Sequence, residues 1–510
     1  MTAIKDHEAH SKSHDETKDI YRPEVDTSGV DEKKLMRRVD WHVIPWLSLL
    51  YLLNFLDRGS IGNAKLYNLE KDLGIDDNQY LIALTLFFFP YALFEVRVEM
   101  PFQNCSDVIL KPASNVILRR LKPSIWLSTM ITLWGIVMSL HGVIHSYGGL
   151  ITLRLLLGLT EAGMYPGIVF YISSWYKRTE MGTKVAIFFS SATVAGAFSG
   201  LLAAAIANMD GIGGRPGWAW IFILEGLATV VVGVISYFII QDFPDTAQFL
   251  SEKERNDNKF SAAGEKFHLK YVWRSLKDWK TWVSMAIYAG FDGPLYAFSL
   301  FTPSIINQLG YTATKANLLS VPVYAWGCLM TLVIGVYADR LGRRCLVNLC
   351  LFGIGLAGYT ILICSRTPAL SYFAVFLAIS AIYPTIPNSV AWVAGNVEGA
   401  YKRSVTLGMA IGFGNINGAV TSNIYRAEDR PWYRLGHGIV LAYIGIGFFS
   451  SILFAVLLHQ ENLKRERGER DEIIEGVDNK NARECNGHYE SIEAAKIDKG
   501  DEWSRFRYTI

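Results

Sequence analysis

Residues 149–171 read GLITLRLLLGLTEAGMYPGIVFY, an apolar run with Arg154 and Glu161 inside it. About 20 apolar residues in a helix cross the hydrocarbon core of a bilayer, and this run is long enough to do so. A charged side chain at that depth costs at least ~2.5 to 3.5 kcal/mol, so its presence there indicates a functional site. Asp57 and Arg58 end a second apolar run. These four residues are therefore the first candidates for function.

Apolar runs of similar length recur along all 510 residues, of which 51% are hydrophobic and only 19% are charged. A single run is also typical of a buried helix in a large soluble enzyme, but many together indicate a membrane protein. We predict an all-α membrane protein whose twelve transmembrane helices lie near residues 42–62, 79–97, 125–145, 149–171, 183–207, 218–240, 281–306, 316–337, 346–364, 369–394, 404–425 and 437–458.

The predicted spans fall into two groups of six, which indicates two pseudo-symmetric six-helix bundles with a solute site between them. The domains we expect are an N-terminal tail at 1–40, a first bundle at 41–240, a polar connector at 241–280, a second bundle at 281–459 and a C-terminal tail at 460–510. Lys and Arg concentrate in the tails and in the loops on their side of the membrane, so both termini are expected to be cytoplasmic. We expect the plasma membrane, with an internal organelle membrane as the alternative.

The loop between the eighth and ninth spans carries a motif. It reads GVYADRLGRR at 335–344, and its defining residues are Gly335, Asp339, Arg340, Gly342, Arg343 and Arg344. This pattern is similar to the signature loop of the major facilitator superfamily, and a degenerate basic copy, SNVILRRLK, occupies 114–122. The resemblance implies a cytoplasmic latch in which Asp339 meets the positive end of a neighbouring helix. The alternative is that these charges only set the topology.

Three further segments resemble one branch of that superfamily, the anion:cation symporters and especially the fungal allantoate permease-like carriers. They are LNFLDRGSIGNA at 53–64, RLLLGLTEAGMYPG at 154–167 and GWAWIFILEG at 217–226. The resemblance implies a carrier of a small organic anion, such as allantoate or another ureide, nicotinate or another vitamin-like acid. It also implies that Arg58 binds the solute carboxylate and that Asp57 is a second proton-sensitive group.

The spacing within the fourth span supports a site for an organic acid. Arg154 and Glu161 are seven residues apart, so they lie on one helix face about 10.5 Å apart along the axis. A guanidinium can hold a carboxylate through two parallel hydrogen bonds, which suits Arg154 as a ligand for the solute. Desolvation favours the protonated form of Glu161, which suits a proton-coupling role. The alternative is an ion pair between the two that only fixes helix packing.

Asp57 and Arg58 are adjacent and project about 100° apart, so we expect one to face the transport pathway and the other to support it. Alternatively, both are ordinary interfacial charges. Polar and aromatic side chains of other spans should complete the cavity. The candidates are Asn54, Tyr165, Tyr288, Asp292, Tyr296, Asn388, Trp392 and Asn415. The segment GAFSG at 196–200 instead indicates close helix packing.

The predicted mechanism is alternating access with proton symport. Protonation of Glu161 would free Arg154, and Arg58 and Arg154 would then bind the solute carboxylate. The expected partners are a small organic anion, a proton and the lipid bilayer, with no cofactor, no metal and no nucleic acid, and the carrier is expected to be a monomer. A proton-independent facilitator or exchanger and a non-transporting nutrient receptor are the alternatives. No nucleophile–base pair or phosphate-binding loop is present, so we do not expect an enzyme.

One segment departs from the family pattern. Residues 97–113, RVEMPFQNCSDVILKPA, lengthen a connection that is tight in such carriers and show no helical or strand periodicity. The hypothesis is a retained intron, and the alternative is a genuine loop extension. We expect the spliced transcript to lack the codons for 97–113, and sequencing of the messenger RNA checks this. Their presence in the mature message would contradict the hypothesis and make the loop a real feature.

Overall fold

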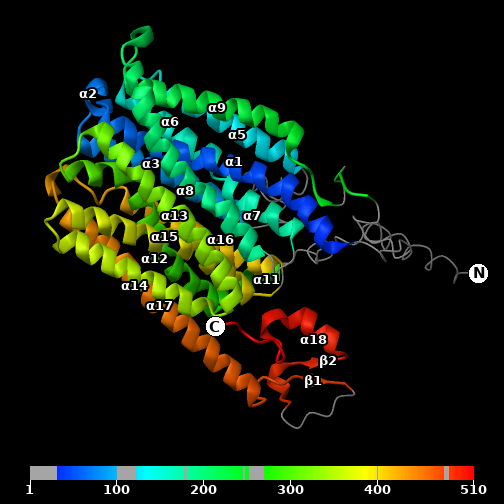
Figure 1. The fold of residues 1–510 in the computed structure, drawn as a ribbon. Helices are drawn as coiled ribbons and strands as arrows, with labels where there is room; N and C mark the ends of the chain where they lie inside the picture. Colours follow the sequence, from blue (N-terminus) through cyan, green and yellow to red (C-terminus); the bar gives the residue numbers. More distant parts are fainter. Residues whose placement is uncertain are drawn as a thin grey trace, which may run out of the picture.

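The computed structural model describes residues 31–99, 122–176, 181–244, 247, 249–251, 269–398, 400–475 and 482–510. Long helices carry the fold in these residues (Figure 1). Those of the first half are α1 Glu32–Leu66, α2 Leu69–Leu73, α3 Asp77–Glu99, α5 Pro123–His141, α6 Tyr147–Glu161, α7 Met164–Trp175, α8 Met181–Ile206 and α9 Gly217–Ile239. Those of the second half are α11 Leu269–Lys277, α12 Trp279–Gln308, α13 Ala313–Leu341, α14 Arg344–Cys364, α15 Pro368–Gly395, α16 Ala400–Thr421 and α17 Arg434–Glu466.

Shorter elements fill the connections and the C-terminal region. The 3-10 helices are η1 Ala207–Met209, η2 Ile212–Gly214, η4 Ala427–Asp429, η5 Glu484–Asn486 and η6 Gly500–Glu502. Strands β1 Ile473–Ile474 and β2 His488–Tyr489 form a parallel pair, and α18 Ile492–Lys499 follows them.

Each of the twelve predicted spans overlaps a helix, and the fourth is divided into α6 and α7 at Ala162 and Gly163. By length and hydropathy alone, eight helices of the described residues can cross a membrane. The other spans are shorter or more polar, as α12 is with Asp292 in its middle. Large apolar side chains such as Phe238 and Phe449 are exposed on the outer helices, as a lipid-facing surface requires. The predicted all-α membrane fold is confirmed.

The two halves pack in the same pattern. In the first half, α1 packs against α8 and α9, α3 against α6, and α5 against α9. The corresponding helices of the second half repeat these contacts, with α12 against α16 and α17, α13 against α15, and α14 against α17. The halves meet where α8 contacts α13 and α15, α3 contacts α16, and α1 contacts α12. The molecule therefore consists of two similar bundles with a seam between them.

Small residues bring the bundles together at α8 and α13. A side chain on Gly196 would overlap the ring of Tyr324, and one on Gly200 would meet the backbone carbonyl of Asn317. The predicted role of this segment in close packing is confirmed, although the partner helix belongs to the other half. Small residues let helix backbones approach closely without a hydrophobic driving force.

Hydrogen bonds across the seam gather at one end of the bundles. We call it the distal end; it carries α2 and the loop between α16 and α17, opposite the start of α1 and the C-terminal region (Figure 1). Asn423 Nδ2 donates to Thr85 Oγ1 at 2.5 Å, and Asn317 Nδ2 donates to Tyr67 Oη at 3.3 Å. The backbone N–H of Ala427 also donates to a carboxyl oxygen of Asp77. These bonds hold the two halves together at the distal end.

The signature loop turns sharply between α13 and α14. Gly342 ends α13 with a φ of 66°, which only glycine adopts without strain. Asp339 pairs with Arg344, at the start of the next helix, and the Arg344 carbonyl accepts a bond from Asn388 Nδ2 at 2.9 Å. These bonds brace the loop against α15. Of the insertion at 97–113 only 97–99 lie in the described residues, at the end of α3, and the basic copy at 114–122 lies outside them except for Lys122.

The C-terminal region folds against the second bundle. Asp501 is fully buried and forms ion pairs with Lys280 of α12 at 2.7 Å and with Lys402 of α16 at 3.0 Å. Trp392 Nε1 donates to the Thr509 carbonyl, and Arg465 donates to the Asp501 carbonyl. The C-terminal region thus binds the ends of α12, α15, α16 and α17 to one another. Asp278 also pairs with both lysines, at 2.9 and 2.8 Å, so two buried carboxylates face two buried ammonium groups, and removal of one group leaves a charge without full compensation.

Burial raises the pKa of Asp501, but attraction from Lys280 and Lys402 outweighs it and leaves the pKa below the ordinary carboxyl value. Because the folded-state pKa is the lower one, this stabilisation is present at neutral pH and is lost only when the pH falls through the lowered value. The ion pairs of Asp501 with the two lysines therefore persist at neutral pH.

We expect Asp501→Asn to destabilise the protein by about 3 kcal/mol, because it leaves two buried ammonium groups with only one of the two carboxylates that they share, Asp278. The measurement is the thermal unfolding midpoint of the purified protein in detergent. Glu502→Gln is the matched control, since Glu502 is half exposed and lies 3.4 Å from Lys402. Equal midpoints for the two variants would contradict this role of Asp501.

Candidate functional site

A buried ion pair joins the first and fourth spans. Arg58 of α1 contacts Glu161 of α6 through Nη2 at 2.5 Å and through Nε at 2.6 Å, both at Oε1. Asn54, one turn before Arg58, donates to the same oxygen at 2.7 Å. The Glu161 side chain is only 2% exposed and that of Arg58 11%. One carboxylate oxygen therefore receives three donors from a single face of α1.

Arg58 also reaches the second half of the molecule. Its Nη1 donates to Tyr296 Oη of α12 at 3.0 Å, and its Nη2 donates to Tyr91 Oη of α3 at 3.1 Å. Tyr296 in turn donates to Asn415 Oδ1 of α16 at 2.5 Å. The guanidinium also lies over the rings of Phe55, Tyr91 and Tyr296. Arg58 thus links both bundles at the middle of the seam.

Asp57 and Arg154 are buried nearby without close partners. Asp57 is 2% exposed and Arg154 4%. Neither oxygen of Asp57, nor Nε and Nη2 of Arg154, has a hydrogen-bond partner among the described residues. The two groups attract one another electrostatically from α1 and α6. Buried polar groups are normally bonded, so unpaired ones point to a ligand or water.

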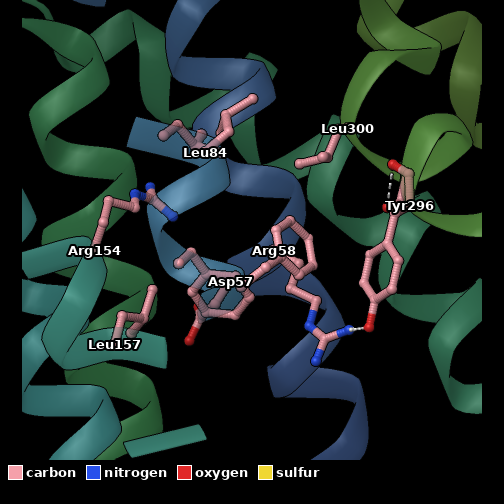
Figure 2. A pocket seen from close by; sticks show the side chains of 11 residues that line it. Asp57, Arg58, Leu84, Arg154, Leu157, Tyr296 and Leu300 are labelled. Atoms are coloured by element: carbon pink, nitrogen blue, oxygen red, sulfur yellow. Dashed lines mark hydrogen bonds between the residues drawn. The ribbon is translucent and has the colours of Figure 1, made fainter. Parts of the chain in front are cut away.

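Asp57, Arg58 and Arg154 line a cavity whose empty space, counted together with the open solvent that adjoins it, is about 420 Å³. Figure 2 shows Arg154 reaching from α6 toward α1, and Arg58 reaching the other way to Tyr296. Both bundles contribute to the cavity wall, which is formed by Asp57, Arg58, Ile61, Leu84, Phe87, Phe88, Arg154, Leu157, Tyr296, Ser299 and Leu300. The cavity combines two cations and one carboxylate with aromatic walls, which suits a small flat anion.

The structure corrects one part of the predicted arrangement. Arg154 and Glu161 share the buried face of α6, as the seven-residue spacing predicts. Glu161, however, bonds to Arg58 and Asn54 of α1 and forms no ion pair with Arg154 within the described residues. Helix α1 supplies the donors because the Asn54 and Arg58 side chains reach Glu161 at the end of α6. Protonation of Glu161 would therefore act first on Arg58, and the release of Arg154 stays a prediction because Glu161 also attracts Arg154 electrostatically.

We expected one of Asp57 and Arg58 to face the transport pathway and the other to support it, and the structure does not show this division. Both line the cavity, Asp57 is buried and the Arg58 side chain is only 11% exposed, so neither is an exposed interfacial charge. Arg58 points toward Glu161 and the second half, whereas Asp57 interacts with Arg154. Adjacent residues can both serve one site here because both Asp57 and Arg58 line the cavity.

The remaining predicted residues are distributed between the cavity and its surroundings. Tyr165 packs near Tyr51, Tyr288 packs against Phe291, and Asp292 lies against the backbone of α16 at Gly414. Almost every α12 residue from 287 to 306 is buried, so the four-residue spacing marks no special face.

Asn388 and Trp392 lie away from the cavity wall. Asn388 bonds to the backbone of Arg344 and to Asn348, and Trp392 bonds to the Thr509 carbonyl. Both side chains brace helix ends, and we leave them out of the site proposed below.

Sequence reasoning missed Tyr91 and Glu225. Tyr91 accepts a hydrogen bond from Arg58, but an aromatic residue in an apolar span carries no distinguishing signal. Glu225 is 5% exposed within α9 and bonds to Ser60 of α1. The sequence could have identified Glu225 by the argument used for Glu161, because an acidic residue inside an apolar run indicates function.

Comparison with known proteins agrees with this architecture. The chain is 34% identical to the MFS-type transporter cnsO of Penicillium expansum, over 86% of each chain. It is 29% identical to the high-affinity nicotinic acid transporter of Saccharomyces cerevisiae, over 90% of this chain and 86% of that protein. The resemblance to fungal carriers is thus confirmed.

A solved structure shares the fold. The bacterial homologue of the human lysosomal transporter Spinster, in an inward-facing and unoccupied conformation, superposes with a TM-score of 0.59 at 16% identity, over 81% of this chain and 97% of that chain. The family model of the Major Facilitator Superfamily matches residues 47–422. The chain therefore belongs to the Major Facilitator Superfamily and is a multi-pass membrane transporter, not an enzyme.

Proposed function

We propose that this transporter is a proton-coupled symporter of a small organic carboxylate. The observation that carries the proposal is the buried Arg154, with unpaired guanidinium nitrogens, in a cavity that also contains Arg58. A buried guanidinium without its bonds is costly, and a carboxylate can satisfy two of its donors at once. The cargo carboxylate is proposed to bind there.

Glu161 is proposed to carry the coupled proton. In its charged form it holds Arg58 through two bonds to one oxygen. Protonation removes that attraction, so Arg58 can turn to the cargo together with Arg154. The net charge then stays balanced: Asp57 and Glu161 oppose the two arginines in the empty site, and Asp57 and the cargo oppose them in the loaded one. A neutral site rearranges at lower desolvation cost than a charged one.

The body of the cargo is proposed to be small and planar. Phe87, Phe88 and Tyr296 line the cavity beside the two arginines, and aromatic walls favour a flat ring or a planar ureide. The nicotinic acid transporter among the relatives supports this class, which includes nicotinate and allantoate. The proposed location is the plasma membrane with both termini in the cytoplasm, and the proposed carrier is a monomer.

We expect Glu161→Gln to keep exchange of labelled carboxylate across the membrane but to lose accumulation driven by an inward proton gradient. Glutamine keeps the hydrogen-bonding shape of the protonated acid and cannot release a proton. The measurement is uptake by cells or proteoliposomes at acidic and alkaline external pH, with and without a protonophore. Glu428→Gln, in an exposed loop, is the matched control.

The labelled panel should contain nicotinate, allantoate and nicotinamide, which keeps the ring of nicotinate without its carboxylate. Uptake of nicotinamide equal to that of nicotinate would contradict carboxylate binding by the arginines. Protonophore-insensitive uptake would instead favour a facilitator or exchanger, and binding without any uptake would favour a receptor.

The seam also predicts how the carrier opens. Alternating access requires the distal bonds between Thr85 and Asn423 to break during the cycle. We expect the Thr85→Cys, Asn423→Cys double variant, with the six native cysteines replaced, to lose uptake on oxidation and to regain it on reduction. The single variants are the controls. Undiminished uptake after complete cross-linking would contradict opening at the distal end.

A further inference from the structure

Glu225 is a buried carboxyl that lies outside the proposed cargo site. It is in the middle of α9, is 5% exposed and is the only charged residue of that helix. Within the described residues it forms no ion pair, and its Oε1 has no hydrogen-bond partner. Its Oε2 contacts Ser60 Oγ of α1. An ionised carboxylate in this position would have no cation to compensate it.

The contact with Ser60 suits both protonation states of Glu225. Ser60 Oγ also lies 2.9 Å from the carbonyl of Leu56, one turn earlier in α1. A hydroxyl has one hydrogen and can accept as well as donate. When that hydrogen points to the Leu56 carbonyl, Glu225 must supply the hydrogen of the second bond and is protonated. When the hydroxyl rotates toward Glu225, the carboxylate accepts instead.

The surrounding charges favour the protonated state. On α1, Asp57 lies one turn before Ser60 and repels a charged Glu225. On α5, the titratable residue is His141. Its Nδ1 lies 2.9 Å from the Val137 carbonyl and its ring stacks on Phe222, so it forms no ion pair with Glu225.

The other elements packed against α9 bring no free cation within the described residues. The charged residue of α8 is Lys184, which pairs with Asp40 at 2.6 Å, and η1 has no charged residue. Arg58 and Arg154 are matched by Glu161 and Asp57 respectively, as described above. Glu225 is therefore the third acid beside two cations.

We propose that Glu225 is a second proton-binding site of the carrier, that it holds a proton in the state seen here, and that Ser60 positions that proton. Because Ser60 and Asp57 share α1 with Arg58, loss of the proton would place two like charges between α1 and α9, next to the cargo site. That Glu225 holds a proton does not depend on the proposed function; that this proton takes part in the transport cycle rests on it.

The test is infrared spectroscopy of the purified, cargo-free protein at neutral pH, in the carbonyl-stretching band of protonated carboxylic acids. We expect Glu225→Gln to lose a component of this band that Glu161→Gln retains. We expect Ser60→Ala to shift the same component to higher wavenumber, because the carboxylic acid loses its hydrogen-bond partner. Because Ser60→Ala keeps the carboxyl group of Glu225, it tests the proposal even if Glu225→Gln does not fold.

An undiminished band in Glu225→Gln, or an unshifted band in Ser60→Ala, would overturn the proposal. Neither result depends on cargo, so this failure is distinct from a failure of the symport proposal, which the uptake of Glu161→Gln decides. Monodisperse elution of each variant in detergent is the control for folding.

Discussion

The pairing of Arg58 with Glu161 is the interaction on which the central structure depends. It ties α1 to α6, and through Tyr296 it extends to the second bundle. Breaking a buried ion pair by removing one partner is costly because it leaves a charge without compensation. A proton or an anion would change that balance without mutation, so the proposed cargo would act on the contact that ties α1 to α6.

Charge balance explains why so many ionisable groups are tolerated at membrane depth. Asp57, Arg58 and Arg154 line one cavity and Glu161 contacts Arg58 beside it, so two carboxyl groups accompany two cations instead of isolated charges facing the bilayer. The separate placement of Glu225, against a serine, follows the same constraint, because a carboxyl with no cation is best kept neutral. Desolvation thus restricts which combinations of charges the site can adopt.

The two ends of the molecule are held by different means. At the distal end, single hydrogen bonds between neutral or exposed groups cross the seam, and such bonds can break and re-form in a transport cycle. At the opposite end, a buried network around Asp501 binds helices of the second bundle to each other. The distal contacts between the bundles are thus weaker than the ion pairs within the second bundle, as rigid-body rocking requires.

The sequence by itself determined the number and approximate limits of the spans, the division into two halves and the shared face of Arg154 and Glu161. These follow from hydrophobic run length and from the helical period, which are local properties of the chain. Only the tertiary structure decided that Glu161 pairs with Arg58, that Asn388 and Trp392 brace helix ends, and that Glu225 meets Ser60. The period of a helix sets which side chains share a face, but the partner opposite that face depends on how separate helices pack, and no spacing within one helix contains that information.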